Sequence, residues 1–563
     1  MSPGTSRAAP YGIGRVRSSL VAYSIGKAIT APLSLLLVLL LAALMPREQY
    51  AAYVSAVALL EIGVVLGTFG VEWVMQTALA GIQVRGNAAQ LRRAVLRLGA
   101  LPCVTYTAAG ALLWTLADHV SAWLGGVAPV AVLQLAGILL ALEGPARVLR
   151  DSLMAVLLLQ RIAQVSQVVR VVGTCAGVYV SVAWLAPGEP LQAATVLRIE
   201  IAVAALALIV AIVGLGWHLR GRAAGQDPSI AAWVGWPSVR FAAHAYVSIV
   251  LMLLIGTDVM TTLVARHLGV EATASFGFVV RLLETARRYL PMDLFWGVVR
   301  PAAIGRYESG GRDARRLMQD CNRMIDANLI AVAGVFTASV VAGDVLVQLL
   351  SGGKVHDAGW LLVCLVPLLA GHTVRRGTEL MAYTLGHSAR FARAAFACLL
   401  AVPLSVLLLT HTGVPHGAPI AVLITDGLFI AVAVHGLRAL GDPVQFSLTR
   451  WQRLVWTTVL ASAAGWTMRA LCTGTAPAVT PWLEAMSWSM SSSMSWSMSW
   501  SMPWSMPWAL HALDLLAQPL IAAGLGTLAA LVAFVAALRG FKVIAPGDTL
   551  LIRLQPDPEE QPS

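Results

Sequence analysis

The chain has 563 residues, of which 58% are hydrophobic and only 12% are charged, and its mean hydropathy is +0.76. This composition excludes a soluble protein with a single core and is typical of a polytopic membrane protein. The formal net charge of +11 would suit a nucleic-acid-binding protein, but the positive charge lies mostly in alternate loops and not in one patch. The six cysteines are scattered without a C-x-x-C pair, so neither a disulfide framework nor a metal site is predicted.

Apolar runs of membrane-spanning length follow one another along the chain, separated by polar breaks. Fourteen spans are predicted, at residues 20–44, 52–77, 98–117, 124–142, 163–185, 193–216, 242–265, 274–299, 326–350, 359–384, 394–410, 417–437, 455–473 and 514–538. The first run lacks a signal-peptide cleavage pattern and is therefore interpreted as a retained span. The predicted fold class is an all-α integral membrane protein with about 14 transmembrane helices.

The polar breaks between the spans predict two six-helix lobes followed by two additional helices. The predicted segments are a cytoplasmic N-terminal segment (1–19), a first lobe (20–217), a polar cytoplasmic linker (218–241), a second lobe (242–438), a cytoplasmic loop (439–454), the two additional helices (455–540) and a cytoplasmic tail (541–563).

Lys and Arg residues are distributed asymmetrically between the two sides of these spans. The side of the N-terminus carries 30 of them, the opposite side carries 5, and 4 lie within spans. Because basic residues are retained on the cytoplasmic side, both termini are predicted to be cytoplasmic.

The first two spans contain charged residues. Lys27 lies in the cytoplasmic third of the first span, where its ammonium either reaches the headgroups or faces a polar cavity. Glu61 and Glu72 lie three helical turns apart in the second span, so they share one face. Glu72 is close enough to the predicted end of the span to reach water, whereas Glu61 requires a polar partner inside.

The seventh and eighth spans contain the densest group of intramembrane charges. Asp258 interrupts the seventh span, and Arg281, Glu284, Arg287 and Arg288 lie in the eighth. An arginine in the middle of a lipid-facing helix costs about 2.5–3.5 kcal/mol even on the lenient insertion scale. These side chains are therefore predicted to face a polar interior, as in a transporter.

Two interpretations of the eighth span remain open. Arg281, Glu284 and Arg288 are spaced i, i+3 and i+7 and so share a face, and the surplus of arginine over glutamate suits an anionic ligand near the midpoint of the span. Alternatively, Glu284 and Arg288 form a buried i, i+4 pair that only braces two helices.

A low-complexity repeat with a period of four, rich in Met, Ser and Trp, occupies residues 486–508. The charge count places it in a periplasmic loop, where it is interpreted as a repeat expansion without function, or alternatively as an aromatic belt at the interface. The sequence Ser351-Gly-Gly-Lys354 lacks the first glycine and the Ser or Thr of a phosphate-binding loop. No catalytic or nucleotide-binding motif is found, so an enzyme, a cofactor and a metal are not predicted.

Several short motifs resemble those of a known family. These are the segments 44–53 (LMPREQYAAY), 66–70 (LGTFG), 267–271 (HLGVE) behind Asp258, Arg300-Pro301, and 350–358 (LSGGKVHDA). They are similar to polysaccharide-export flippases of the multidrug/oligosaccharidyl-lipid/polysaccharide exporter superfamily, whose best-known members are the O-antigen (Wzx-type) flippases. The resemblance covers roughly residues 18–440. The Met/Trp repeat and the two glutamates of the second span depart from the family pattern.

The resemblance implies two lobes that alternate between inward and outward openings and move an undecaprenyl-diphosphate-linked oligosaccharide across the bacterial inner membrane. The implied partners are this substrate, membrane lipids and other polysaccharide-export proteins. The expected substrate-binding residues are Arg281, Arg287, Arg288 and Lys27, because guanidinium groups suit a diphosphate. Without a nucleotide-binding motif, an ion gradient must supply the energy, and Glu61, Asp258 and Glu284 are the expected ion-coupling carboxylates.

Three alternative functions stay open. A peptidoglycan-precursor flippase differs only in substrate. A cation or drug antiporter of the same superfamily would require an acidic cavity, whereas the eighth span is net basic. A membrane-embedded polymerase or ligase would require a sizeable outer loop with catalytic residues, whereas the long outer loop of this chain is the Met/Trp repeat.

Overall fold

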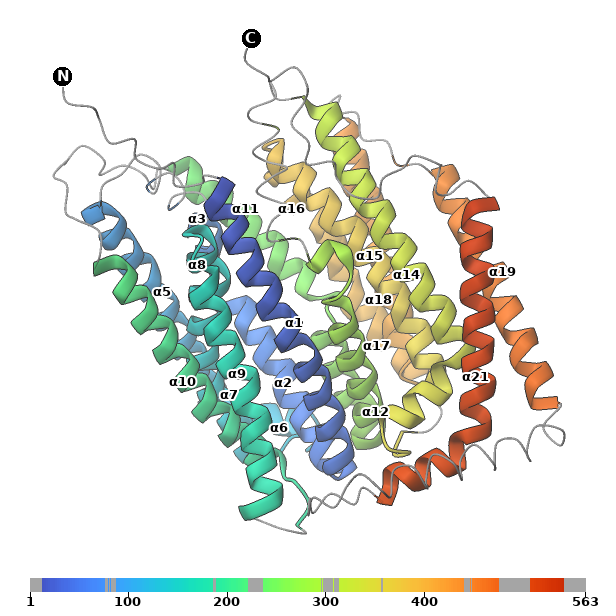
Figure 1. Cartoon of the computed structure of the whole chain (residues 1–563). Coiled ribbons are helices and arrows are strands. Elements are labelled where there is room, and N and C mark those ends of the chain that lie inside the picture. The colour runs from blue at the N-terminus through green and yellow to red at the C-terminus, as the bar shows by residue number, and fades with distance from the viewer. Residues whose placement is uncertain are drawn as a thin grey trace. The chain divides into compact units, whose positions relative to one another are not determined.

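The computed structural model (Figure 1) describes residues 13–75, 79, 82, 88–185, 189–220, 236–294, 296, 307, 313–355, 358–439, 446, 448–474 and 507–540. All regular elements in these ranges are helices. The predicted N-terminal segment, the linker, the Met/Trp repeat and the tail lie wholly or largely outside the described residues. The predicted all-α integral membrane class is confirmed.

The described residues contain eleven helical segments that are long and apolar enough to cross a membrane. One of these segments, Val239–Arg287, contains the seventh predicted span and residues 274–287 of the eighth. Two further helices, α15 (Gly359–Thr384) and α19 (Leu448–Gly474), coincide with the predicted tenth and thirteenth spans. Each of the fourteen predicted spans therefore overlaps helix, although turns interrupt the second at residues 68–70, the seventh at 254–256 and the eighth at 288–290.

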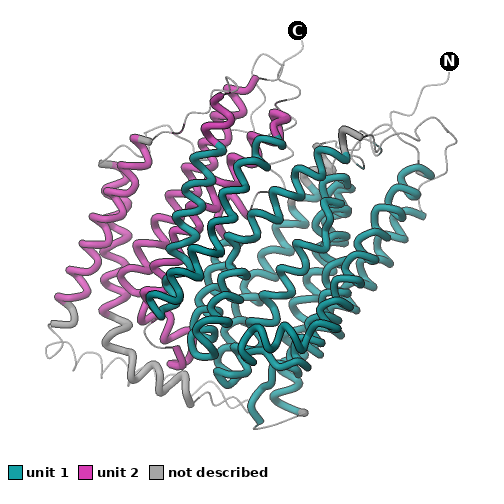
Figure 2. Tube along the Cα trace, turned by 180° about the vertical axis from the view of Figure 1, so that it is seen from behind, with its two compact units in different colours: residues 1–288, 388–433 teal, residues 289–387, 434–563 magenta. Residues whose placement is uncertain are grey.

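Contacts between helices divide the chain into two compact units, residues 1–288 with 388–433 and residues 289–387 with 434–563 (Figure 2). The first unit contains α1 (Ile13–Leu44), α2 (Arg47–Gly67), α3 (Val71–Val74), α5 (Ala88–Thr115), α6 (Ala117–Trp123), α7 (Val130–Arg147), α8 (Met154–Val156), α9 (Gln160–Val180), α10 (Ala193–Arg220), α11 (Trp236–Leu253), α12 (Thr257–Arg287), α16 (Ser388–Ala395) and α17 (Ala401–Thr412). The second contains α14 (Ala314–Leu350), α15, α19 and α21 (Pro507–Gly540), and α18 (Gly417–Arg438) runs across the boundary.

This division differs from the predicted lobes at 20–217 and 242–438. The physical reason is the packing of α12, which lies against α2 and also contacts α1 and α17, while α11 packs on α16. These contacts join α11 and α12 to the helices that precede them in the chain. The functional division into two six-helix lobes stays a prediction.

A bundle of long helices forms most of the first unit (Figure 1). Within it, α7 packs against α2, α5 and α10, and α9 packs against α1 and α10. In α7, Pro145 precedes a π-helical segment, Val148–Leu153, before α8 begins. Wide turns of this kind are frequent at functional sites.

Helix α12 is a hairpin of two helical halves. Asp258 and Arg281 are 23 residues apart, and in one straight helix they would be separated by about 35 Å. Instead, Arg281 Nη2 lies 3.3 Å from Asp258 Oδ1. The chain reverses at Gly269, whose φ of 76° and ψ of −162° are not helical and are readily adopted only by glycine. The hairpin supplies the predicted turn between the seventh and eighth spans.

The predicted eighth span, 274–299, is not one continuous helix. Helix α12 ends at Arg287, a turn follows at residues 288–290, and helix begins again at Pro291. Proline lacks the N–H that a continuing helix requires and restricts the preceding residue, so a new helical turn begins there. Arg287 and Arg288 therefore lie at the end of a helix and not within a continuous one, while their expected position near the midpoint of the span stays a prediction.

Candidate functional site

The first group of charged side chains, here called the α12 cluster, consists of Asp258, Arg281, Glu284, Arg287 and Arg288. Arg281 donates to Glu284 Oε2 at 2.8 Å and to Asp258 Oδ1 at 3.3 Å, and the Thr257 hydroxyl donates to the other oxygen of Glu284. The side chains of Arg281, Asp258 and Glu284 are 13–17% exposed. One guanidinium thus joins the two halves of the α12 hairpin.

Glu284 pairs with Arg281 and not with Arg288, which was the partner in the predicted brace. Arg288 is the first residue after the helix, so Glu284 and Arg288 do not form an i, i+4 pair within α12. In the described part of the chain, neither Arg287 nor Arg288 lies within ion-pair distance of a carboxylate. Arg287 is half-buried and Arg288 is exposed, so both guanidinium groups are available to a ligand.

The second group of charged side chains, here called the α7 cluster, comprises Glu61, Glu143, Arg147, Arg150, Arg170 and Glu200. Arg147 holds Glu61 through two parallel hydrogen bonds of 2.6 and 2.7 Å, which is the strongest geometry for an arginine–carboxylate pair. The same guanidinium donates through Nε to Glu143 at 3.0 Å. Glu61 thus has the interior partner that its place in the span requires.

Glu143 is the centre of the α7 cluster. Its side chain is 4% exposed, and it accepts from Arg147 and from Arg170, each at 3.0 Å, with Arg150 at 3.8 Å. Arg170 lies 3.5 Å from Glu200, whose other oxygen accepts from the Tyr53 hydroxyl at 2.9 Å. Arg150 also pairs with the 64% exposed carboxylate of Asp151 at 3.2 Å, so each of the three arginines has a carboxylate partner.

The two clusters face each other across the contact between α2 and α12. At Gly277 the helices approach so closely that a Cβ atom would overlap the side chain of Val54. The carboxylate of Glu61 interacts electrostatically with Arg281 and Arg288 as well as with Arg147. Every arginine of the α7 cluster has a carboxylate partner, whereas the α12 cluster has three arginines against two carboxylates and so carries one surplus positive charge.

Lys27 lies on α1, which packs against α9 and also contacts α12. Its ammonium stands over the ring of Tyr23, 5.4 Å from the centroid. This contact is a cation–π interaction, which holds the side chain along its own helix. The expected role of Lys27 at the substrate stays a prediction.

Comparisons with protein families and with curated proteins find no sequence match. The structure is nevertheless similar to solved structures. A structure of the lipid II flippase MurJ in an inward closed conformation matches with a TM-score of 0.61 and 10% identity over 93% of this chain and 100% of that chain. A structure of the MATE multidrug transporter DinF-BH matches with a TM-score of 0.55 and 12% identity over 78% of this chain and 98% of that chain.

The chain therefore has the fold of this flippase and this multidrug transporter. At these low identities the likeness shows the fold and leaves the substrate to be argued from the charged clusters. The fold that the resemblance in the sequence motifs implies is confirmed, whereas these matches do not test membership of the O-antigen flippases.

Apart from Glu61, the residues of the α7 cluster are not among the expected site residues. From the sequence, Glu143 is interpreted as a polar break, which ends the fourth span at residue 142 and assigns Arg147 and Arg150 to a loop. In the structure, helix continues through the π-helical segment to Val156. The overlooked signal is the spacing of Glu143, Arg147 and Arg150 at i, i+4 and i+7, which places all three on one helix face.

Proposed function

We propose that the chain is a transporter that moves an undecaprenyl-diphosphate-linked oligosaccharide across the bacterial inner membrane for surface polysaccharide synthesis. Transport proceeds by ion-coupled alternating access, both termini are cytoplasmic, and other polysaccharide-export proteins are the partners. The likeness to MurJ and to a MATE transporter supports the transporter class.

One observation carries the substrate proposal. Arg287 and Arg288 are consecutive residues at the end of α12. In the described residues, neither has a carboxylate within ion-pair distance, whereas the neighbouring charged residues of the α12 cluster are paired with one another. A diphosphate must be desolvated as it crosses, and guanidinium groups replace its water with directional hydrogen bonds. The two arginines are thus suited to hold the two phosphoryl groups of a polyprenyl diphosphate.

Arg281 takes a different role in this proposal. Its guanidinium is already engaged by Asp258 and Glu284, so it is less available to the substrate than Arg287 and Arg288. It holds the two halves of the hairpin together and orients the end of α12. Of the expected substrate-binding residues, Arg287 and Arg288 therefore make the direct phosphate contacts, and Arg281 is a positioning residue.

The carboxylates proposed for ion coupling each have an arginine partner, Arg147 for Glu61 and Arg281 for Asp258 and Glu284. An adjacent arginine favours the ionised form of a carboxylate. At Glu61 and Glu284, a proton or sodium ion can therefore replace the arginine only when the pair separates during the transport cycle. A diphosphate held by Arg287 and Arg288 would attract the neighbouring Arg281, weaken its hold on Glu284 and so couple substrate to ion.

The test uses cells that lack the gene and measures surface polysaccharide together with the amount of transporter in the membrane. Arg288→Ala is expected to abolish export at normal abundance. Arg288→Lys is expected to restore only part of it, because lysine keeps the charge but loses the planar fork that holds two oxygens. The matched control is Arg266→Ala, at an exposed arginine in the other half of α12. Full export by Arg288→Ala would contradict the proposal, as would equal losses in the two alanine variants.

A peptidoglycan-precursor flippase is the second candidate, because the structure is similar to the lipid II flippase MurJ over 93% of the chain. Its substrate carries the same diphosphate, so Arg287 and Arg288 would serve equally well. Deletion of the gene separates the two candidates. Loss of surface polysaccharide with normal growth supports the export role, whereas lysis through failure of wall synthesis supports the peptidoglycan role.

The remaining alternatives have less support. A cation antiporter would place an organic cation beside a surplus guanidinium, which repels it. A polymerase or ligase would rely on catalytic groups in a long outer loop, and the predicted outer loop of Met, Ser and Trp offers no carboxylate within the repeat.

A further inference from the structure

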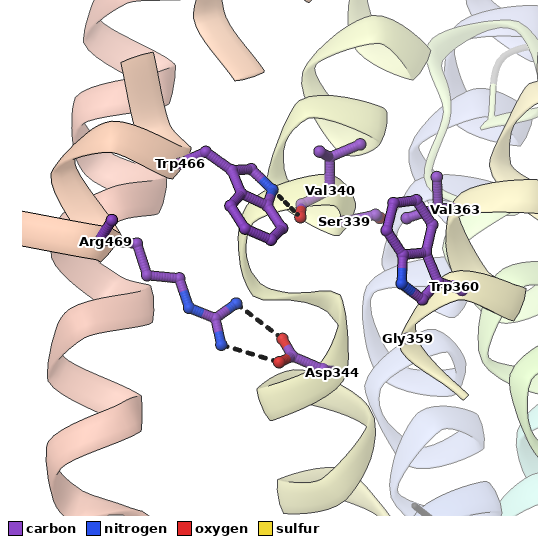
Figure 3. A pocket seen from close by; sticks show the side chains of 9 residues that line it. Ser339, Val340, Asp344, Gly359, Trp360, Val363, Trp466 and Arg469 are labelled. Atoms are coloured by element: carbon purple, nitrogen blue, oxygen red, sulfur yellow. Dashed lines mark hydrogen bonds and ion pairs between the residues drawn. The ribbon is translucent and has the colours of Figure 1, made fainter. Parts of the chain in front are cut away.

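A cavity of about 330 Å³ lies in the second unit, between the ends of α14, α15 and α19. Four of its lining side chains are large or charged, namely Asp344 on α14, Trp360 on α15, and Trp466 and Arg469 on α19 (Figure 3). The cavity is formed by helices separate from both clusters of the first unit. The proposed roles of the two clusters therefore do not account for this cavity.

The two charged residues that line this cavity form an ion pair that is partly exposed. Arg469 donates to both carboxylate oxygens of Asp344, at 2.9 and 2.8 Å, and also to the carbonyl of Val341. The Arg469 side chain is 19% exposed and that of Asp344 is 52% exposed. A positive and a negative group are thus presented side by side, both fixed in position and both reachable from the cavity.

The two tryptophans flank this pair (Figure 3). Trp466 donates its indole N–H to the carbonyl of Val340 at 2.9 Å, which fixes the orientation of its ring. Trp360 and Trp466 nevertheless remain 65% and 49% exposed. Indole faces attract ammonium groups, and tryptophans are enriched where a membrane meets water.

The cavity lies at headgroup depth if the helices cross the membrane as their length suggests. Asp344 is six residues from the end of α14 and Arg469 is five residues from the end of α19, which corresponds to about 8–9 Å along each helix. Trp360 is the second residue of α15. A ligand that reaches the cavity from the side is therefore a membrane lipid.

We propose that this cavity binds the headgroup of a zwitterionic phospholipid. The phosphate contacts Arg469, and the ammonium contacts Asp344 and the faces of Trp360 and Trp466. A headgroup that carries both a positive and a negative charge complements the Asp344–Arg469 ion pair. A headgroup that is only anionic is repelled by the half-exposed carboxylate of Asp344. The ordinary alternative is that Asp344 and Arg469 only brace α14 against α19 and that the tryptophans only contact the interface.

The experiment uses the purified full chain in detergent and counts retained lipids by native mass spectrometry. Three probes are added separately: phosphatidylethanolamine, phosphatidylglycerol and soluble phosphoethanolamine. Phosphatidylethanolamine is expected to be retained at least about fivefold more strongly than phosphatidylglycerol, because only the former supplies an ammonium to the tryptophans and Asp344. Soluble phosphoethanolamine is expected to bind weakly, since it lacks the acyl chains that place the headgroup at this depth. Equal retention of the two lipids, or binding of phosphoethanolamine as strong as that of the lipid, would overturn the proposal.

The variants separate lipid binding from bracing. Trp360→Leu leaves the ion pair intact and is expected to lower phosphatidylethanolamine retention about fivefold. Trp456→Leu is the matched control, because Trp456 is a 63% exposed tryptophan on α19 that does not line the cavity. Asp344→Asn is expected to remove the preference over phosphatidylglycerol. Should Asp344→Asn fail to fold, the comparison of the two tryptophan variants still decides, and equal effects there contradict the site.

Discussion

The α7 and α12 clusters contain the same chemical groups but differ in their balance. In the α7 cluster, each of the three arginines has a carboxylate partner, and Glu143 at its centre is almost completely buried. In the α12 cluster, Arg281 is shared by two carboxylates, while Arg287 and Arg288 follow at the helix end. Buried charges that are fully paired keep a fold in one arrangement, whereas a surplus charge at the edge of such a network can be satisfied by a ligand. We therefore interpret Glu143 and its arginines in the α7 cluster as a brace and the end of α12 as a binding site.

The largest expected effect is on stability, from removing the centre of the brace. Glu143→Ala leaves three arginines without their shared carboxylate and is expected to lower the free energy of unfolding by about 3–5 kcal/mol. Chemical denaturation of the purified protein in detergent measures this. Glu271→Ala is the control, since that carboxylate is 86% exposed. A small loss for Glu143→Ala would contradict the role of the α7 cluster as a brace.

A smaller loss is expected in the α12 cluster. Arg281→Ala leaves Asp258 and Glu284 without their common partner, in a site that is more open than that of Glu143, and is expected to cost about 1–3 kcal/mol. Combining it with Asp258→Asn and Glu284→Gln should recover most of the membrane abundance, because no carboxylate is then left unpaired. If the triple variant were as unstable as the single one, the pairing of Arg281 with these two residues would not explain the loss.

The smallest expected effect comes from an exposed pair at the loop ends. Arg47 and Glu271 lie 3.4 Å apart, with side chains 49% and 86% exposed. Solvent weakens such a pair, so Glu271→Ala is expected to change the free energy of unfolding by less than about 1 kcal/mol. Equal export by the variant and the unaltered protein would agree with this. A large defect would show that the loops on this side take part in transport.

The helices could be predicted from the sequence because their signal is local. Long apolar runs and short polar breaks locate each span, and the polar segment around Gly269 indicated the turn that forms the α12 hairpin. The contact between Asp258 and Arg281 could not be predicted in the same way, because it depends on the relative rotation of two helices.

Other parts of the site could not be predicted, because the hydropathy rules that locate the ends of spans fail where buried charges are paired or where a proline interrupts the helix. A glutamate such as Glu143 normally marks the end of a span, but here arginines from two helices compensate its charge, so helix continues past it. The position of Arg287 and Arg288 depends on Pro291, which ends the regular helix that hydropathy alone would extend. The partner of Glu284 is Arg281, three residues earlier on the same helical half, and not Arg288, four residues later, because the helix ends at Arg287.

The most direct test of the account compares the affinity of the purified protein for undecaprenyl diphosphate and for undecaprenyl monophosphate. If Arg287 and Arg288 hold the two phosphoryl groups, the unaltered protein should bind the diphosphate at least about tenfold more tightly, since each charge-assisted contact contributes about 1.5–3 kcal/mol in a desolvated site. Arg288→Ala should remove most of this preference, and Arg266→Ala should leave it unchanged. Equal affinities for the two lipids in the unaltered protein, or a preference that survives in Arg288→Ala, would contradict the assignment of the end of α12 as the diphosphate site.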